Sequence, residues 1–156
     1  MKKIHETFLI SIPLIIFIVL ADRASKIFFL NILSLGESIP VVRNILHFTL
    51  VHNTGIAFGL FKNQGVLFIG VSLAAVLFFS WLLFFHRESS LLDRLSIVAF
   101  SLIISGAIGN LIDRLQYGFV VDFIDFRVWP VFNVADSAIT IGACIFIFTC
   151  IPFSAK

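Results

Sequence analysis

Two aspartates, Asp122 and Asp136, are the residues whose type and spacing best suit acid–base chemistry in this sequence. On one straight α-helix they would lie about 21 Å apart, because the helix rises about 1.5 Å per residue. Pro130 lies between them, and a proline breaks a helix because it fixes φ and has no N–H. A turn there would bring the two carboxylates face to face. Such a pair shares one proton, so one member can accept a proton from water while the other donates to a substrate carbonyl.

The same acids also have structural interpretations. The segment Asn133-Val-Ala-Asp136 has the spacing of a helix capping box, with Asn133 as the N-cap and Asp136 at position N3. Capping and catalysis are compatible roles for one residue. Asp122 and Asp125 could also be solvated loop acids. The sequence assigns no role to Asp125, which could compete with its neighbour Asp122 as a member of the pair.

Four other polar residues are candidates for a supporting role. Asn110 and Arg114 are four positions apart, so they share one face of a helix. Arg114 could neutralise a carboxylate or bind a carbonyl group, or it could simply extend to the membrane interface. Asn53 precedes a glycine and could do no more than form a turn. Asp22 follows an apolar run, where the helix dipole opposes an acid, so we expect it to have a cationic or hydrogen-bonding partner.

The composition is that of an integral membrane protein. Of the 156 residues, 60% are hydrophobic and only 13% are charged, whereas about a quarter are charged in a soluble domain. The length suits a single domain, residues 1–156. The net charge of +2 is too small to suggest a nucleic-acid partner. The sequence has no Cys/His spacing of a zinc site and no HExxH motif, so we expect no metal.

Four apolar runs predict transmembrane helices, at about 8–28, 66–85, 95–112 and 134–153, since about 20 residues cross the hydrocarbon core. The first run has an alternative interpretation as a cleaved signal peptide. Residues 29–64 predict a small β-sheet or hairpin at the membrane surface, because Leu46, Phe48 and Leu50 alternate on one face and glycines punctuate the segment. Residues 86–94 predict a short charged loop, and 115–132 an irregular stretch.

The predicted spans place the candidate residues on one side of the membrane. The opposite side holds only the two termini and the 86–94 loop, and these short segments carry five basic residues. Basic residues concentrate in short cytoplasmic segments, so we expect both termini in the cytoplasm and the polar cluster near the outer face. That cluster comprises Asp22, Asn53, Asn110, Asp113, Arg114, Asp122, Asn133 and Asp136.

Five short motifs together resemble lipoprotein signal peptidase, the signal peptidase II family of membrane aspartic peptidases. Each motif alone is weak, but all five occur in the family's order on a chain of the right length. They are Asp22-Arg-Ala-Ser-Lys26, Asn53-Thr-Gly-Ile-Ala-Phe58, Gly109-Asn-Leu-Ile-Asp-Arg114, Val120-Val-Asp-Phe123 and Phe132-Asn-Val-Ala-Asp136.

The resemblance implies a fold, a reaction and a location. The fold would be all-α, with four transmembrane helices and a small extracytoplasmic β-cradle at about 29–64. Asp122 and Asp136 would be the catalytic dyad, supported by Asp22, Asn53, Asn110, Arg114 and Asn133. The enzyme would remove the signal peptide of a prolipoprotein by cleaving before the diacylglyceryl-modified cysteine. It would act at the outer face of the bacterial cytoplasmic (inner) membrane, among its lipids, without metal or cofactor, and would bind globomycin-like inhibitors. We expect a monomer.

Two other classes of membrane protein fit the sequence less well. A lipid-phosphate enzyme would need clustered Arg, Lys and His to bind phosphate, whereas the predicted cluster is rich in acids and amides. A non-enzymatic proton relay would need ionisable groups along the depth of the membrane, and the second predicted helix contains none. The sequence therefore favours the peptidase.

Overall fold

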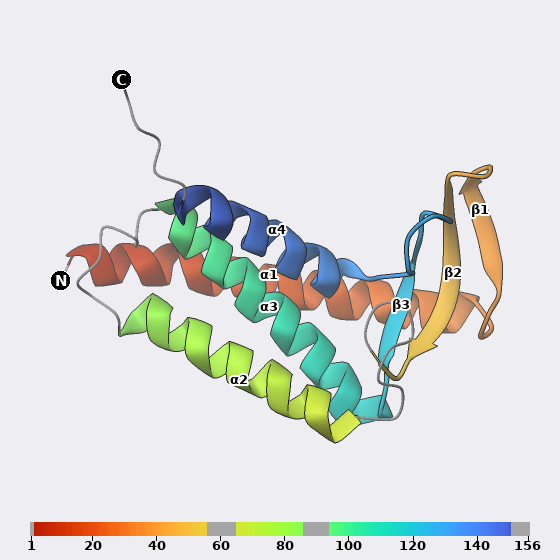
Figure 1. Ribbon diagram of the computed structural model, residues 1–156, viewed down its shortest axis with the longest axis horizontal. Helices are drawn as coiled ribbons and strands as arrows, with labels where there is room; N and C mark the ends of the chain where they lie inside the picture. Colours follow the sequence, from red (N-terminus) through yellow and green to blue (C-terminus); the bar gives the residue numbers. More distant parts are fainter. Residues whose placement is uncertain (1, 56–64, 86–93, 151–156) are drawn as a thin grey trace.

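Four helices and three strands make up the fold. The computed structural model describes residues 2–55, 65–85 and 94–150, and the helices run beside one another with the sheet at the end of the bundle away from the N-terminus (Figure 1). In chain order the elements are α1 (Lys2–Ile32), β1 (Ser38–Val42), β2 (Leu46–Asn53), α2 (Gly65–Phe84), α3 (Arg94–Tyr117), β3 (Val120–Asp125) and α4 (Val134–Cys150).

The helices differ from the predicted ranges mainly in length. Helix α1 extends to Ile32, so Asp22 lies inside it rather than at its end. Helix α3 continues to Tyr117, beyond the predicted end at 112, because Asp113 and Arg114 find partners within the protein. Helix α4 begins at Val134 as predicted. The predicted loop at 86–93, the 56–64 part of the predicted cradle and the last predicted helical residues, 151–153, lie outside the described residues.

The sheet has a strand that the sequence did not predict. Strands β1, β2 and β3 form an antiparallel sheet in that order, and β3 lies in the stretch predicted to be irregular. Five of its six residues are buried, so the polar–apolar alternation that marks a half-exposed strand is weak. Pairing of β3 with β2 sets Asp122 opposite Val51 and Val120 opposite Asn53. The sheet therefore brings Asn53, the first residue of the second motif, beside the fourth motif.

Three of the described helices are long and apolar enough to cross a membrane, and α4 is a shorter apolar helix within the described residues. In the most apolar 18-residue stretch of α3, 72% of the residues are buried, against 17% in α1 and in α2. Helix α3 is thus the inner helix, whereas α1 and α2 turn most of their apolar side chains outward. Such exposed apolar surface fits a lipid environment, and the chain is a multi-pass membrane protein.

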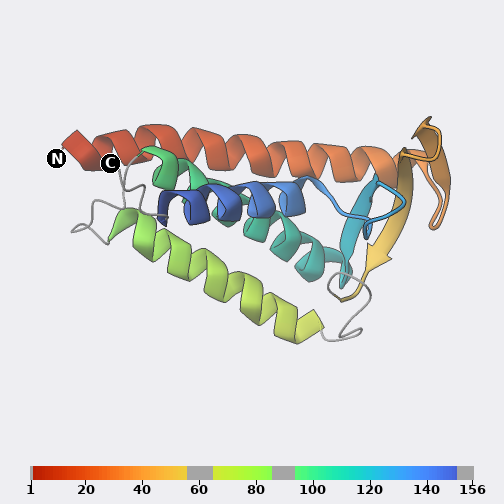
Figure 2. The same ribbon diagram turned by 45° about the horizontal axis from the view of Figure 1, so that its top comes forward.

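Aromatic packing fixes the sheet on the end of α1. Phe29 of α1 and Leu33, just after the end of α1, form a buried cluster with Leu50 of β2 and with Val121 and Phe123 of β3. The rings of Phe29 and Phe123 stack with their centroids 4.3 Å apart. Figure 2 shows that α1 runs the length of the molecule and meets the sheet at its far end. This contact gives β3, and Asp122 with it, a fixed place relative to the bundle.

Helices α3 and α4 approach each other closely at glycines. A Cβ atom added at Gly106 would collide with the Ala135 carbonyl oxygen and come within 2.7 Å of Ile139 Cγ1. A Cβ atom added at Gly142 would lie 2.6 Å from the Ala99 carbonyl oxygen. Small residues let helix backbones approach closely in membranes, where dispersion contacts drive helix association. The start of α4 is therefore seated directly on α3.

Gly106→Ala should destabilise the protein, because the new methyl group has no room against the backbone of α4. Overpacking of this kind typically costs about 1–3 kcal/mol. We expect the thermal unfolding temperature in detergent to fall by several degrees. Gly70→Ala on α2 is the matched control, since a Cβ atom there meets no other atom within 4 Å. Equal unfolding temperatures for the two variants would contradict the close contact.

Candidate active site

The first turn of α4 is closed by a reciprocal cap, as the sequence predicted. Asn133 Oδ1 accepts a hydrogen bond from the backbone N–H of Asp136 at 2.8 Å, and Asp136 Oδ2 accepts one from the backbone N–H of Asn133 at 3.3 Å. These are the two bonds of a capping box. The cap fixes the position of the Asp136 side chain relative to the start of the helix.

Asn133 also joins the two candidate aspartates. Its Nδ2 donates to Asp122 Oδ1 at 2.7 Å, while its Oδ1 holds the Asp136 backbone. The loop that contains Pro130 returns the chain between them, and a bridge pairs Ile124 with Phe132. The predicted reversal of the chain at this proline is therefore confirmed, and it brings both acids to one asparagine.

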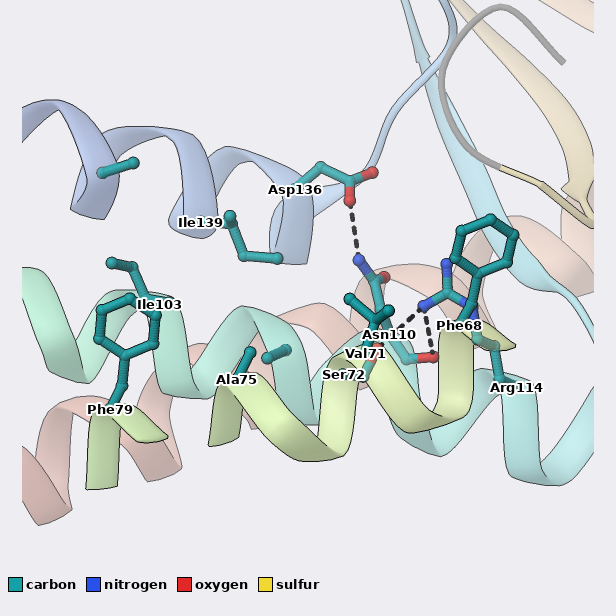
Figure 3. Close-up of a pocket in the computed structure, with 12 residues that line it drawn as sticks. Phe68, Val71, Ser72, Ala75, Phe79, Ile103, Asn110, Arg114, Asp136 and Ile139 are labelled. Atoms are coloured by element: carbon teal, nitrogen blue, oxygen red, sulfur yellow. Dashed lines mark hydrogen bonds between the residues drawn. The ribbon is translucent and has the colours of Figure 1, made fainter. Parts of the chain in front are cut away.

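Two further amides complete the coordination of the carboxylates. Asn53, at the end of β2, donates from Nδ2 to Asp122 Oδ2 at 2.9 Å, and its Oδ1 accepts the N–H of Gly55. Asn110 of α3 donates from Nδ2 to Asp136 Oδ1 at 2.7 Å (Figure 3). Each of the four carboxylate oxygens of Asp122 and Asp136 thus accepts one N–H. The site is built from α3, β2, β3 and the start of α4.

The surroundings of Asp122 strongly change the pKa of its carboxyl group. Its exposed fraction is 1%. Burial raises the pKa of Asp122 from its ordinary 3.8 to about 7, and the charge of the nearby Asp136 adds to the rise, against the hydrogen bonds from Asn53 and Asn133. A carboxyl group that holds its proton near neutral pH can act as a general acid.

Asp125 lies in a separate set of contacts although it is close in sequence. It accepts hydrogen bonds from Thr49 Oγ1 at 2.7 Å and from the backbone N–H of Arg127 at 2.8 Å. Burial alone would raise its pKa, but these bonds and the Arg127 charge hold the pKa of Asp125 below its ordinary value. Asp125 therefore stabilises the turn after β3 and is not hydrogen-bonded to either candidate aspartate.

A buried ion cluster, consisting of Asp22, Arg23, Lys26 and Asp113, lies behind the two aspartates. Lys26 has no exposed surface, and its Nζ lies 2.8 Å from both Asp22 Oδ2 and Asp113 Oδ2. Arg23 forms an ion pair with the other oxygen of Asp113. Asp22 had been expected to have a cationic partner, and Lys26 is that partner.

The ion cluster also holds backbone groups of the site. Asp22 Oδ1 accepts the N–H of Ala135 at 3.0 Å, and Asp113 Oδ2 accepts the N–H of Val121 at 3.0 Å. The first bond fixes the start of α4 and the second fixes β3 beside Asp122. The sequence predicted a supporting role for Asp22 and placed Asp113 in the polar cluster, but it assigned no role in the site to Asp113 or Lys26. The spacing of Asp22 and Lys26, four residues apart, was the available signal.

A pocket of about 390 Å³ opens beside the aspartates between α2, α3 and α4. Asn110, Arg114 and Asp136 line one end, as Figure 3 shows, and the rest of the wall is largely apolar. Small residues keep the space open, and the larger lining side chains are mainly aromatic or branched. The remaining lining residues are Phe68, Val71, Ser72, Ala75, Phe79, Ile103, Ala107, Ile139 and Ala143.

Arg114 extends along the polar end of this pocket. Its Nη1 lies 3.4 Å from Ser72 Oγ and 3.5 Å from the Asn110 carbonyl oxygen, and its guanidinium lies over the Phe68 ring. The predicted shared face of Asn110 and Arg114 is confirmed, since both line the pocket. The arrangement places one cation and one carboxylate at the mouth of an apolar space.

The described residues contain no group of three or more His, Cys, Asp or Glu side chains that could hold a metal ion. The oxygens that a metal would require are instead engaged by N–H donors and by Lys26.

A family model and individual relatives of known function agree on one family for this chain. The profile described as Signal peptidase (SPase) II matches residues 14–152. The lipoprotein signal peptidase of Clostridioides difficile is 45% identical over 142 residues, covering 90% of this chain and 91% of that protein. The lipoprotein signal peptidase of Moorella thermoacetica is 45% identical over 125 residues, covering 80% and 81%.

Solved structures agree with the sequence comparison. Two structures of bacterial membrane enzymes match with a TM-score of 0.81 each, at 31% and 30% identity. They cover 88% and 92% of this chain, and 85% and 94% of their own chains. The resemblance inferred from the five motifs is confirmed: the chain belongs to the signal peptidase II family.

Proposed function

We propose that Asp122 and Asp136 are the catalytic dyad of an aspartic endopeptidase. The observation that carries this proposal is the set of amide donors around the pair. Asn53, Asn110 and Asn133 hold all four carboxylate oxygens in place, and burial raises the pKa of Asp122 to about 7. A shared proton between two buried carboxylates is the state that aspartic hydrolysis requires.

The dyad would act in two proton-transfer steps. In the first, the ionised carboxylate takes a proton from water as the water oxygen attacks the scissile carbonyl carbon, and the protonated carboxyl group donates its proton to the carbonyl oxygen. In the second, the ionised carboxylate takes a proton from one hydroxyl of the tetrahedral diol as the carbonyl re-forms, the C–N bond breaks, and the protonated carboxyl group gives its proton to the leaving amine. The pair ends with one shared proton, so no covalent enzyme intermediate and no cofactor is needed.

The substrate proposed is a diacylglyceryl-modified prolipoprotein, cut immediately before the modified cysteine to release the signal peptide. The family membership supports this class of substrate, since the matched relatives are named lipoprotein signal peptidases. The pocket would receive an apolar part of this substrate, because its wall is apolar and one end reaches Asp136. Arg114, at that end, could hold a substrate carbonyl, and globomycin-like inhibitors would compete for the same space.

The proposed topology has four spans and both termini in the cytoplasm. The described part of α4 has 17 residues, or about 26 Å at the helical rise, which is close to the roughly 30 Å hydrocarbon thickness. The sheet and the dyad would then lie near the outer face of the inner membrane, where a lipid-anchored peptide is accessible. All the described hydrogen bonds of the site join residues of a single chain, which supports a monomer.

The rival functions fit the contacts less well. A lipid-phosphate enzyme would need cations directed toward a ligand, whereas Lys26 and Arg23 form ion pairs with Asp22 and Asp113. A proton relay would need the aspartates to connect with polar groups deeper in the membrane. Below Asp136 the pocket is lined by Ala143, Phe79 and Ile103, which cannot carry a proton.

Asp122→Asn and Asp136→Asn should each reduce peptide cleavage by roughly a hundredfold to ten-thousandfold, the usual contribution of acid–base catalysis. The measurement is release of the signal peptide from a diacylglyceryl-modified prolipoprotein by purified protein. Asp125→Asn is the matched control, because it is a neighbouring acid in the same strand with separate partners. Full activity of either dyad variant, or equal loss in the control, would refute the assignment.

Stability should depend on pH through Asp122. Its pKa rises from 3.8 to about 7 on folding, so between about pH 4 and pH 7 the folded state binds the extra proton. Stability from this group is complete below the lower value and is lost as the pH rises through the upper one. We expect wild type to lose more thermal stability than Asp122→Asn between pH 5 and pH 8. A constant difference between the two proteins would contradict the raised pKa.

Labelling of single cysteines in intact cells should report the topology. The starting protein has Cys144 and Cys150 replaced by serine, and Ile45→Cys then adds a thiol to the exposed turn between β1 and β2. We expect a membrane-impermeant maleimide to label position 45 from outside. Ser90→Cys should react only after the membrane is permeabilised. The reverse pattern would overturn the proposed orientation.

A further inference from the structure

We infer that Lys26 is a positioning residue for the dyad: it fixes the orientation of the Asn110 amide, which in turn directs an N–H to Asp136. This inference rests on the proposed role of Asp122 and Asp136. It assigns to Lys26 a part in the reaction beyond neutralising Asp22 and Asp113. No step of the proton transfer passes through Lys26 itself.

The Asn110 amide has two possible orientations, and Lys26 excludes one of them. Lys26 Nζ donates to Asn110 Oδ1 at 3.2 Å, and Asn110 Nδ2 donates to Asp136 Oδ1 at 2.7 Å. An ammonium group has donors and no acceptor. A reversed amide would therefore set two donors against each other at Lys26 and two acceptors against each other at Asp136.

The same orientation continues into Asn133. Asn110 Oδ1 also accepts Asn133 Nδ2 at 3.2 Å, so this Nδ2 must face the Asn110 oxygen and Asp122 Oδ1. The Asn133 oxygen is left to accept the N–H of Asp136. One buried cation thus fixes the direction of the bonds that reach both aspartates. A charge on the first donor also polarises the amide and strengthens the bond that the amide donates.

Lys26 is itself held rigidly enough for this role. Its Nζ has three oxygen neighbours: it forms ion pairs with Asp22 Oδ2 and Asp113 Oδ2 and donates a hydrogen bond to Asn110 Oδ1. Its side chain is wholly buried, so water does not compete for these bonds. Arg23 differs in one respect that matters. It pairs with Asp113 and contacts Gln116 and Tyr117, and within the described part of the chain it makes no hydrogen bond to the Asn110 amide.

The charges that face the dyad come from two helices. Lys26 acts on it from α1 and Arg114 from α3, and Asp22 and Asp113 are the ion-pair partners of Lys26. The positive charge of Lys26 lowers the pKa of Asp122 against the larger effect of burial. Removal of Lys26 would therefore raise that pKa further. Because the two carboxyl groups titrate as a pair, the change would appear in the pH profile of the whole dyad.

The test compares Lys26→Met with Arg23→Gln, which each remove one cation from the same ion cluster. We expect Lys26→Met to lower kcat by roughly tenfold to a hundredfold, as for a misplaced catalytic group, with KM within about twofold of wild type. Its pH–activity profile should move to higher pH. Arg23→Gln should lose thermal stability, but its kcat and pH profile should change much less than those of Lys26→Met.

A second variant covers the case in which Lys26→Met does not fold. The double variant Asp22→Asn/Lys26→Met removes one charge of each sign, so Asp113 keeps Arg23 as its partner, and the same changes in kcat and pH profile are expected. A folded variant without Lys26 that keeps the wild-type kcat and pH profile would overturn the inference. Failure of the dyad itself is distinguishable, because Asp122→Asn would then remain active.

Discussion

The rest of the site depends on how the backbone N–H groups in the first turn of α4 find hydrogen-bond acceptors. A helix begins with backbone N–H groups that have no partner inside the helix. Here Asn133 accepts the N–H of Asp136, and Asp22, from a helix more than a hundred residues earlier, accepts the N–H of Ala135. A cap is typically worth about 1 kcal/mol. In this protein it also defines where a buried carboxylate points, because Asp136 is part of the capped turn.

Charge balance explains how so many acids are tolerated in one buried region. An unpaired buried charge costs several kcal/mol, so acids of this kind require partners. Asp22 and Asp113 have them in Lys26 and Arg23. Those two cations are thereby occupied and do not form ion pairs with Asp122. The hydrogen-bond donors that the described residues offer Asp122 are neutral amides, and burial raises its pKa to about 7. Asp22 and Asp113 are thus bound by cations, whereas Asp122 and Asp136 are bound by amide N–H groups.

Features that depend on local sequence were predictable, whereas contacts between distant segments were not. The capping box and the reversal at Pro130 follow from neighbouring residues, and both were predicted. Strand β3 was missed because a short strand buried on both faces has no clear alternation. Lys26 and Asp113 were not identified as site residues, because charged residues near the end of an apolar run suggest an interfacial position. Their burial arises only when α1 and α3 pack together.

The helices that line the pocket differ in how tightly they pack against one another. Helix α4 is seated on α3 through Gly106 and Gly142, backbone against backbone, so the two cannot separate without loss of close contacts. Helix α2 meets α3 through long side chains, such as the tilted rings of Phe79 and Phe100. Side chains can change rotamer at less cost than a backbone contact can open. A bulky apolar guest would therefore be accommodated by displacement on the α2 side. A larger guest would thus shift α2, whereas the polar residues on α3 and α4 would keep their positions.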